Sequence, residues 1–266
     1  MSRSSTAANL VLATLLACQP AASTPPTPAS MCPPSVSTSD TMPSACSIME
    51  RHVARIGGRQ VLAGIQSVQY DATLEYSAAG IRADVTAYAA RPNRLLVRAV
   101  VTGIGEISNG FDGRVGWSIA PMIGPRLLEG RELVTARENA DFDAFAKNPS
   151  RYSSTETVGR TEFEGRPAWH VRATLQSGRQ VDEYYDAETE LQIGSVSEQE
   201  TAAMSARITT IFEDYRQFGP LLLPARELQR LPGGQQTVLT RTAVQFNTVP
   251  DSVFVLPPQI QALVGK

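Results

Sequence analysis

Residues 67–101 read SVQYDATLEYSAAGIRADVTAYAARPNRLLVRAVV, and this stretch decides the fold. Apolar and polar residues alternate through three runs, which are separated by Ala78-Ala79-Gly80 and by Arg91-Pro92-Asn93. A period of two is typical of β-strands with one buried face. Because the joints are short, neighbouring strands are expected to run antiparallel. The stretch therefore predicts the centre of an antiparallel sheet.

The same alternation continues on both sides of a break at residues 126–147. Before the break, two arms meet at Asp112-Gly113, a pair typical of tight hairpin turns. The break itself has apolar residues without alternation, which predicts one or two helices. An opening helix is predicted from Ser47, with Glu50 completing a capping box, to Gly57-Gly58. Further strands are predicted at 153–160, 166–175, 179–186, 191–199, 204–216, 221–230 and 235–247.

These elements predict a mainly β (α+β) protein. We expect a curved antiparallel sheet of about eleven strands, an unclosed β-barrel, with helices over its concave face. Residues 47–266 are long enough to form this as a single domain.

The first residues have the layout of an export signal. Residues 1–18, MSRSSTAANLVLATLLAC, combine one positive charge with a short apolar run and end in a lipobox-like Leu-Leu-Ala-Cys. The run is too short to span a bilayer. We expect lipidation at Cys18 and an exported protein that is anchored to a membrane. By analogy this is the outer membrane, facing the periplasm, because Gln19 follows the cysteine at the position where some bacteria use Asp to retain lipoproteins in the inner membrane. The alternative, a buried N-terminal helix, is disfavoured by the Pro-rich residues that come next.

Residues 19–46 are rich in Pro, Ser and Thr and nearly uncharged. Such a segment buries too little apolar surface to fold, so it is predicted to be a disordered tether. It contains the two remaining cysteines, Cys32 and Cys46. In an oxidising compartment they can form a disulfide, and two free thiols are the alternative.

Composition argues against several classes of function. A net charge of -2 is unfavourable for a nucleic-acid binder, and no catalytic motif with a recognised spacing occurs. The chain has only two histidines, His52 and His170, so we expect no metal site and no cofactor. Acidic pairs such as Asp141/Asp143 have the spacing of ordinary solvated turns. We therefore expect a protein that is not an enzyme.

The order of these signals resembles the outer-membrane lipoprotein carrier and receptor proteins, LolA and LolB, and their superfamily. The matching features run from the opening helix to the C-terminus: Gly57-Gly58, Arg91-Pro92-Asn93-Arg94, Asp112-Gly113 with Trp117, Ala140-Asp141-Phe142, Tyr185-Asp186, Asp214-Tyr215-Arg216 and Val249-Pro250-Asp251. The resemblance implies an unclosed barrel around a hydrophobic cavity that helices cover. It implies a fold more than a particular cargo.

The apolar rows supply candidates for such a cavity, and alanines such as Ala72, Ala87 and Ala99 leave space beside them. The predicted cavity residues are Val68, Tyr70, Leu74, Val85, Leu95, Val97, Val115 and Trp117, and the predicted lid residues are Leu128, Leu133, Phe142 and Phe145. Burial of acyl chains there would contribute ~0.8 kcal/mol per CH₂ group.

Two functions are favoured from sequence, and a hydrolase that joins His170 or His52 to a carboxylate and a nucleophile is the least favoured alternative. The first is a monomeric, non-catalytic protein that binds lipid or lipoprotein acyl chains. The second is a periplasmic protein-interaction or sensor module without lipid cargo, which predicts a filled core and an exposed apolar patch.

Overall fold

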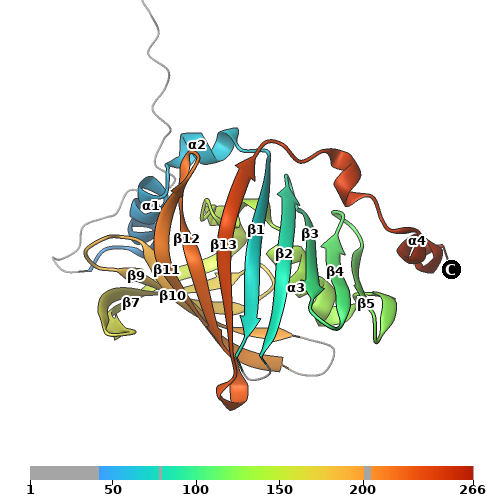
Figure 1. Cartoon of the computed structure of the whole chain (residues 1–266). Helices are drawn as coiled ribbons and strands as arrows, with labels where there is room; N and C mark the ends of the chain where they lie inside the picture. Colours follow the sequence, from blue (N-terminus) through green and yellow to red (C-terminus); the bar gives the residue numbers. More distant parts are fainter. Residues whose placement is uncertain (1–41, 78–79, 201–204, 266) are drawn as a thin grey trace, which may run out of the picture.

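One continuous antiparallel sheet dominates the computed structural model, which describes residues 42–77, 80–200 and 205–265 (Figure 1). Thirteen strands occur within these residues, in the spatial order β6-β5-β4-β3-β2-β1-β13-β12-β11-β10-β9-β8-β7. The strands are β1 Ser67–Tyr76, β2 Ile81–Ala90, β3 Arg94–Val101, β4 Gly105–Phe111, β5 Gly116–Ala120, β6 Gly124–Leu127, β7 Tyr152–Phe163, β8 Arg166–Leu175, β9 Gln180–Asp186, β10 Gln192–Glu200, β11 Ser205–Phe218, β12 Leu221–Arg230 and β13 Gln236–Phe246. The mainly β class and the curved, unclosed sheet are confirmed, because β6 and β7 remain unpaired edges of this sheet.

The predicted count of about eleven strands is too low. The clearest addition is β6, which ends inside the segment predicted to be helical and pairs with β5. Pro125 lies in this strand opposite Ile119. Proline is tolerated here because an edge strand does not need the backbone donor that proline lacks.

The hairpin at Asp112-Gly113 is longer than the predicted two-residue turn. Phe111 pairs with Gly116, so four residues form the loop. The Asp112 carboxylate accepts the backbone N–H groups of Arg114 and Val115, each at 2.7 Å. The aspartate thus stabilises a wider loop by a local side-chain hydrogen bond.

Four α-helices occur in the described residues: α1 Ala45–Arg55, α2 Arg59–Gly64, α3 Gly130–Asn139 and α4 Pro258–Val264. The short 3₁₀ turns are η1 Phe142–Ala144, η2 Pro149–Arg151, η3 Pro232–Gly234 and η4 Asp251–Phe254. Helix α1 begins two residues before the predicted Ser47, because Ser44 is the N-cap and its side chain accepts the Ser47 N–H at 3.2 Å. None of the helices in these ranges is long and apolar enough to cross a bilayer.

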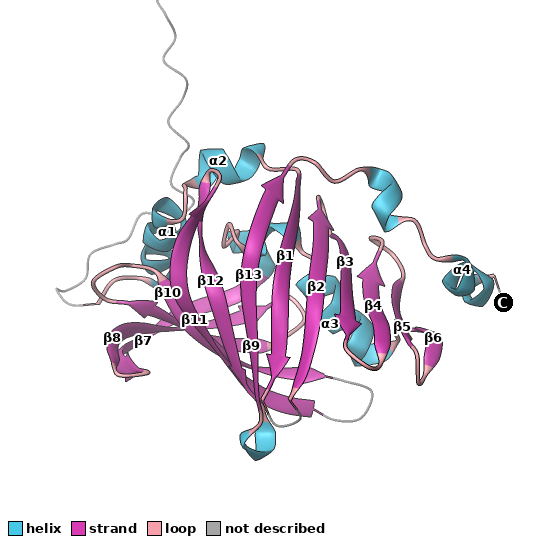
Figure 2. Ribbon diagram, in the orientation of Figure 1, coloured by secondary structure: helices cyan, strands magenta, loops and turns pink. Residues whose placement is uncertain are grey.

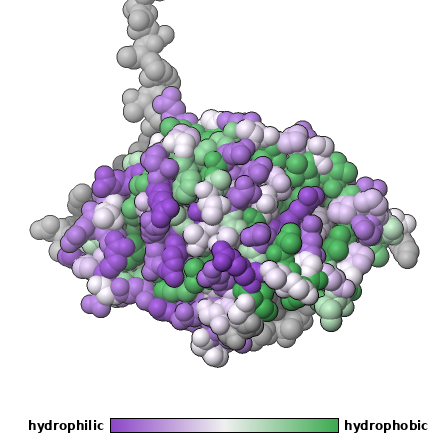
Figure 3. Space-filling view, in the orientation of Figure 1, coloured by the Kyte–Doolittle hydropathy of each residue, from purple (hydrophilic) through white to green (hydrophobic). Residues whose placement is uncertain are grey.

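The helices lie on both faces of the sheet (Figure 2). Helix α1 packs on β8 and β9 through Ile48 and Met49, and α3 contacts β4, β5 and β10 on the same side. The C-terminal segment with η4 and α4 instead covers the opposite face, where Phe254 and Ile260 pack on Trp117. Hydrophobic residues are prominent in this part of the surface, on the right of Figure 3.

Candidate ligand-binding cavity

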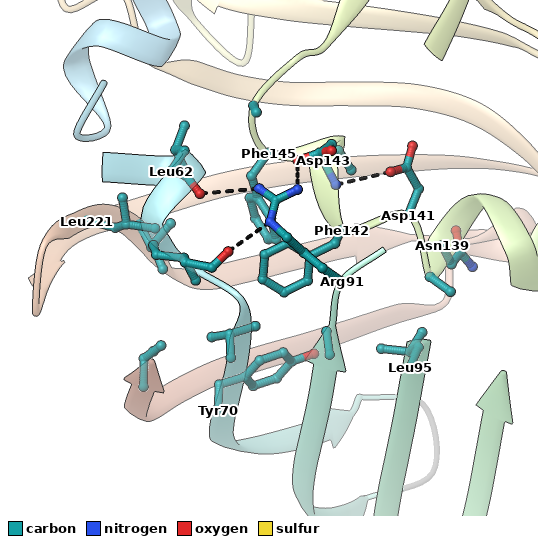
Figure 4. A pocket seen from close by; sticks show the side chains of 18 of the residues that line it. Leu62, Tyr70, Arg91, Leu95, Asn139, Asp141, Phe142, Asp143, Phe145 and Leu221 are labelled. Atoms are coloured by element: carbon teal, nitrogen blue, oxygen red, sulfur yellow. Dashed lines mark hydrogen bonds and ion pairs between the residues drawn. The ribbon is translucent and has the colours of Figure 1, made fainter. Parts of the chain in front are cut away.

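A cavity of about 400 Å³ lies between the concave face of the sheet and residues 138–146, which we call the lid (Figure 4). Its walls come from strands distant in sequence, β1–β3 on one side and β12–β13 on the other. They bring together apolar side chains from both sides: Val68, Leu95, Val97, Leu221, Leu223, Val244 and Phe246. Ala89 opposes Val68 across β1 and β2, and its short side chain leaves space at the wall.

Four predicted cavity residues line this space: Val68, Tyr70, Leu95 and Val97. Leu74 pairs with Ala83, and Val85 pairs with Ala72, so both lie on the same concave face of the sheet. Neither of them lines the cavity. The alternation that predicted this wall is therefore correct in phase along β1, β2 and β3.

The placement of Val115 and Trp117 in the cavity is wrong. Trp117 pairs with Gly110, one residue out of phase with the inward-facing Phe111, and its indole lies over Gly110 on the convex face. A Cβ at Gly110 would come within 2.5 Å of the ring. Val115 packs in the same convex cluster. This end of the sheet is apolar on both faces because the C-terminal segment covers the outer one.

The predicted lid residues separate into two pairs. Phe142 and Phe145 line the cavity, and Phe142 also packs with the core cluster below α2. Leu128 and Leu133 pack instead beside Gly116 of β5, where a Cβ would come within 3.2 Å and 3.0 Å of them. The lid itself contains the end of α3 and one 3₁₀ turn, so it is thinner than a pair of helices.

Arg91 fastens the lid to the sheet (Figure 4). Its guanidinium donates to the carbonyls of Ile65 and Leu62 at 2.9 and 3.2 Å and to Asp143 Oδ1 at 2.5 Å. The same group lies over the Phe142 ring, 4.9 Å from its centroid. One side chain, in the turn after β2, thus connects the C-terminal end of α2 with the lid.

Two further arginines hold the lid from other directions. Arg151 Nε lies 3.1 Å from Asp141 Oδ2, and Arg179 Nε donates to Glu138 Oε2 at 2.6 Å. Asp141 caps the η1 turn by accepting the Asp143 N–H at 3.0 Å, as its spacing predicted, and both partly exposed carboxylates are in addition paired with arginines. Sequence alone gave no signal for these pairs, because neither separation, 10 residues for Asp141–Arg151 and 41 for Glu138–Arg179, is a recognised helix or strand spacing.

On the sheet side, Tyr70 and Arg241 are the polar residues of the cavity floor. The Arg241 guanidinium lies 5.0 Å from the Tyr70 ring centroid, donates to the Pro224 carbonyl at 2.6 Å and pairs with Glu227. Burial raises the pKa of the Tyr70 phenol, opposed by Arg241 and assisted by Glu227, so the hydroxyl stays protonated.

The concave face beside the cavity is filled. Lys147 Nζ lies 2.7 Å from Glu183 Oε1, with both side chains 8% exposed, and the Tyr185 hydroxyl donates to Glu183 Oε2 at 2.6 Å. His52 packs edge-on against the Tyr185 ring, and burial lowers its pKa to about 3, with a smaller effect from Lys147. This cluster is a buried polar core.

The two histidines do not form a joint site. His52 Nδ1 accepts the Gln192 N–H at 3.2 Å on the α1 side. His170 Nε2 lies 2.8 Å from Asp182 on β9, and its ring stacks on Tyr184. The neighbouring Val171 faces α1, so His170 points to the other face of the sheet.

The predicted signal, Cys18 and Cys32 lie outside the described residues. Cys46, in the first turn of α1, is disulfide-bonded. Its predicted pairing with Cys32 stays a prediction.

No family model and no curated protein matches this sequence. Solved structures do match its fold. A LolA superfamily protein from Nitrosomonas europaea is 14% identical, with a TM-score of 0.56 over 81% of this chain and 99% of that chain. A DUF1329 family protein from Desulfovibrio piger is 10% identical, with a TM-score of 0.54 over 78% and 95%.

A third structure, an outer membrane lipoprotein-sorting protein domain from Vibrio parahaemolyticus, is 12% identical, with a TM-score of 0.51 over 82% of this chain and 97% of that chain. At identities this low, the similarity indicates a shared fold and does not indicate a shared activity. Together with the half-barrel and its lidded cavity, they show that this chain has the fold of the LolA superfamily.

Proposed function

We propose that this protein is an exported, membrane-tethered carrier or receptor that holds the acyl chains of lipids or lipoproteins in the cavity beneath the lid. The observation that carries the proposal is the cavity itself, about 400 Å³ with mainly apolar walls from five strands. Buried apolar space of this size is a typical small-molecule site. The lid would exclude water from a bound chain.

Several features support this assignment over the interaction module. The module predicts a filled concave face, whereas part of this face is hollow. The solved structures of the same fold include a lipoprotein-sorting domain. The predicted lipobox at Cys18 and the tether would hold the cavity near a membrane surface.

The test is uptake of a pyrene-labelled hexadecanoic acid methyl ester by the purified full chain, together with native mass spectrometry for co-purified lipid. An Ala89→Trp variant places a large ring in the cavity wall and is expected to abolish uptake. The matched control is Val100→Trp, because Val100 is 53% exposed and outside the cavity. A protein that carries no lipid and takes up no probe would contradict the proposal.

Membrane attachment has a separate test. Cys18→Ala is expected to leave the chain unacylated and to move it from the membrane fraction to the soluble fraction. Retention of this variant in membranes would mean that residues 1–18 act as an anchor helix.

A further inference from the structure

The Tyr70 hydroxyl is a polar group of the cavity that the fold itself does not use. Within the part of the chain that the structure describes, the Tyr70 hydroxyl has no hydrogen-bond partner, although Tyr70 lines the cavity. Figure 4 shows Tyr70 on the strand side, across the cavity from Arg91 and Phe142. A hydroxyl placed among apolar walls loses its hydrogen bonds to water when a chain fills the space. A bound ligand that supplies an acceptor would restore that bond.

The ring of Tyr70 is fixed from both sides, so its hydroxyl has a defined position. On β1 it pairs with Ala87 of β2 and Val244 of β13. The Arg241 guanidinium lies over its face and is held in turn by the Pro224 carbonyl and Glu227. A group held in this way needs little ordering when a ligand binds, which favours a specific contact.

The charges around the cavity decide what kind of acceptor fits. Four arginines line it, and each is paired with an acid: Arg91 with Asp143, Arg151 with Asp141, Arg179 with Glu138 and Arg241 with Glu227. No cation among these four is left to neutralise an added negative charge. A carboxylate at Tyr70 would lose its hydration in an apolar space, and the nearest cation, Arg241, is already paired with Glu227, so its burial is unfavourable.

We infer that the cavity selects a neutral acyl ligand, and that the Tyr70 hydroxyl donates a hydrogen bond to its ester or amide carbonyl oxygen. The inference rests on the proposed acyl-binding function and narrows it to a ligand class. Esterified or amide-linked acyl chains, as in glycerolipids and acylated proteins, belong to this class. Ionised free fatty acids do not.

The experiment compares three probes on the full chain: pyrene-labelled hexadecane, pyrene-labelled hexadecanoic acid methyl ester and the free acid above its pKa. Wild-type protein is expected to bind the ester more tightly than the ionised acid. Tyr70→Phe is expected to weaken ester binding by about three- to tenfold and to leave hexadecane binding unchanged. Tyr88→Phe is the matched control, since Tyr88 packs on the convex face.

The outcomes separate this inference from the proposed function. If hexadecane and the ester both bind but Tyr70→Phe changes neither, the carbonyl contact is wrong and acyl binding stands. Tighter binding of the ionised acid than of the ester would also overturn the inference. If no probe binds, the proposed function itself fails.

Discussion

Two halves of the same concave face differ in how they are filled. Over β8 and β9, helix α1 inserts Ile48 and Met49 against Val171 and Tyr185, all 4% exposed or less. Over β1–β3 and β12–β13, a lid made of the end of α3 and one 3₁₀ turn leaves a cavity. Strands with the same alternation of apolar and polar residues therefore form either a filled core or a cavity, depending on which helix or turn covers them. The comparison predicts that mutations in the filled half change stability, and that those in the hollow half change ligand binding.

The largest effect is expected at the buried ion pair of the filled half. Lys147→Met leaves the Glu183 carboxylate buried without its cation, and the loss of one such partner costs about 3–5 kcal/mol of unfolding free energy. Urea denaturation measures it. Arg82→Met is the matched control, because the Arg82–Glu75 pair is 62% and 56% exposed and is worth less than ~1 kcal/mol. Equal losses in both variants would mean that Lys147 is not buried as described.

The next effect is a dependence of stability on pH through His52. Burial lowers its pKa to about 3 in the folded protein against an ordinary 6.5, so the unfolded chain binds the extra proton first. The contribution of neutral His52 to the unfolding free energy is fully present above the ordinary pKa of 6.5 and declines as the pH falls toward 3. Between pH 7 and pH 5 the loss should be about 2 kcal/mol from this group.

The control for His52 is a variant that cannot titrate but can still accept the Gln192 N–H. His52→Asn should lose less stability than wild type over the same pH interval, as measured by urea denaturation at each pH. If the two proteins lose stability in parallel, His52 is not the group responsible.

A pair of identical substitutions tests the contrast directly. Ala173 is 0% exposed beneath α1, so Ala173→Leu should overpack that half and cost about 1–3 kcal/mol. Ala89 lines the cavity, so Ala89→Leu should change stability by less than ~1 kcal/mol and instead weaken binding of an acyl probe. Denaturation and probe titration of both variants measure the effects. Equal destabilisation would show that the space beside Ala89 cannot accept added volume.

The unclosed barrel could be predicted from sequence because the alternation of apolar and polar residues is a local pattern. The same alternation predicted four residues of the cavity wall: Val68, Tyr70, Leu95 and Val97. It failed where the outcome depends on partners distant along the chain. Trp117 was assigned to the wrong face because the C-terminal segment makes the convex face apolar too.

Polar residues of the cavity were missed for a related reason. Arg179 and Arg241 are ordinary charged residues in their local sequence. They become part of the site only through pairing with Glu138 and Glu227, which the folded arrangement brings near them. Neither contact has a local spacing that marks it.

The smallest effect is expected where the lid meets the hollow half. Asp143→Asn removes the charge that Arg91 contacts but leaves the arginine hydrogen bonds to Leu62 and Ile65, so the lid stays folded. Because both side chains are partly exposed, the loss of stability should be under ~1 kcal/mol. Weaker closure should nevertheless raise the rate of acyl-probe entry, by about two- to fivefold for a change of this size.

The matched control breaks an ion pair of similar type away from the lid. Asp251→Asn removes the Arg94 contact at 2.9 Å, which joins β3 to the C-terminal segment on the convex face. Stopped-flow fluorescence at low and high salt compares the two variants, because screening should speed entry in wild type and leave the rate of Asp143→Asn unchanged. Faster entry in both variants would show that opening involves the whole sheet and not the lid. Faster entry in Asp143→Asn alone would place the barrier to the hollow half at the contact between Arg91 and the lid.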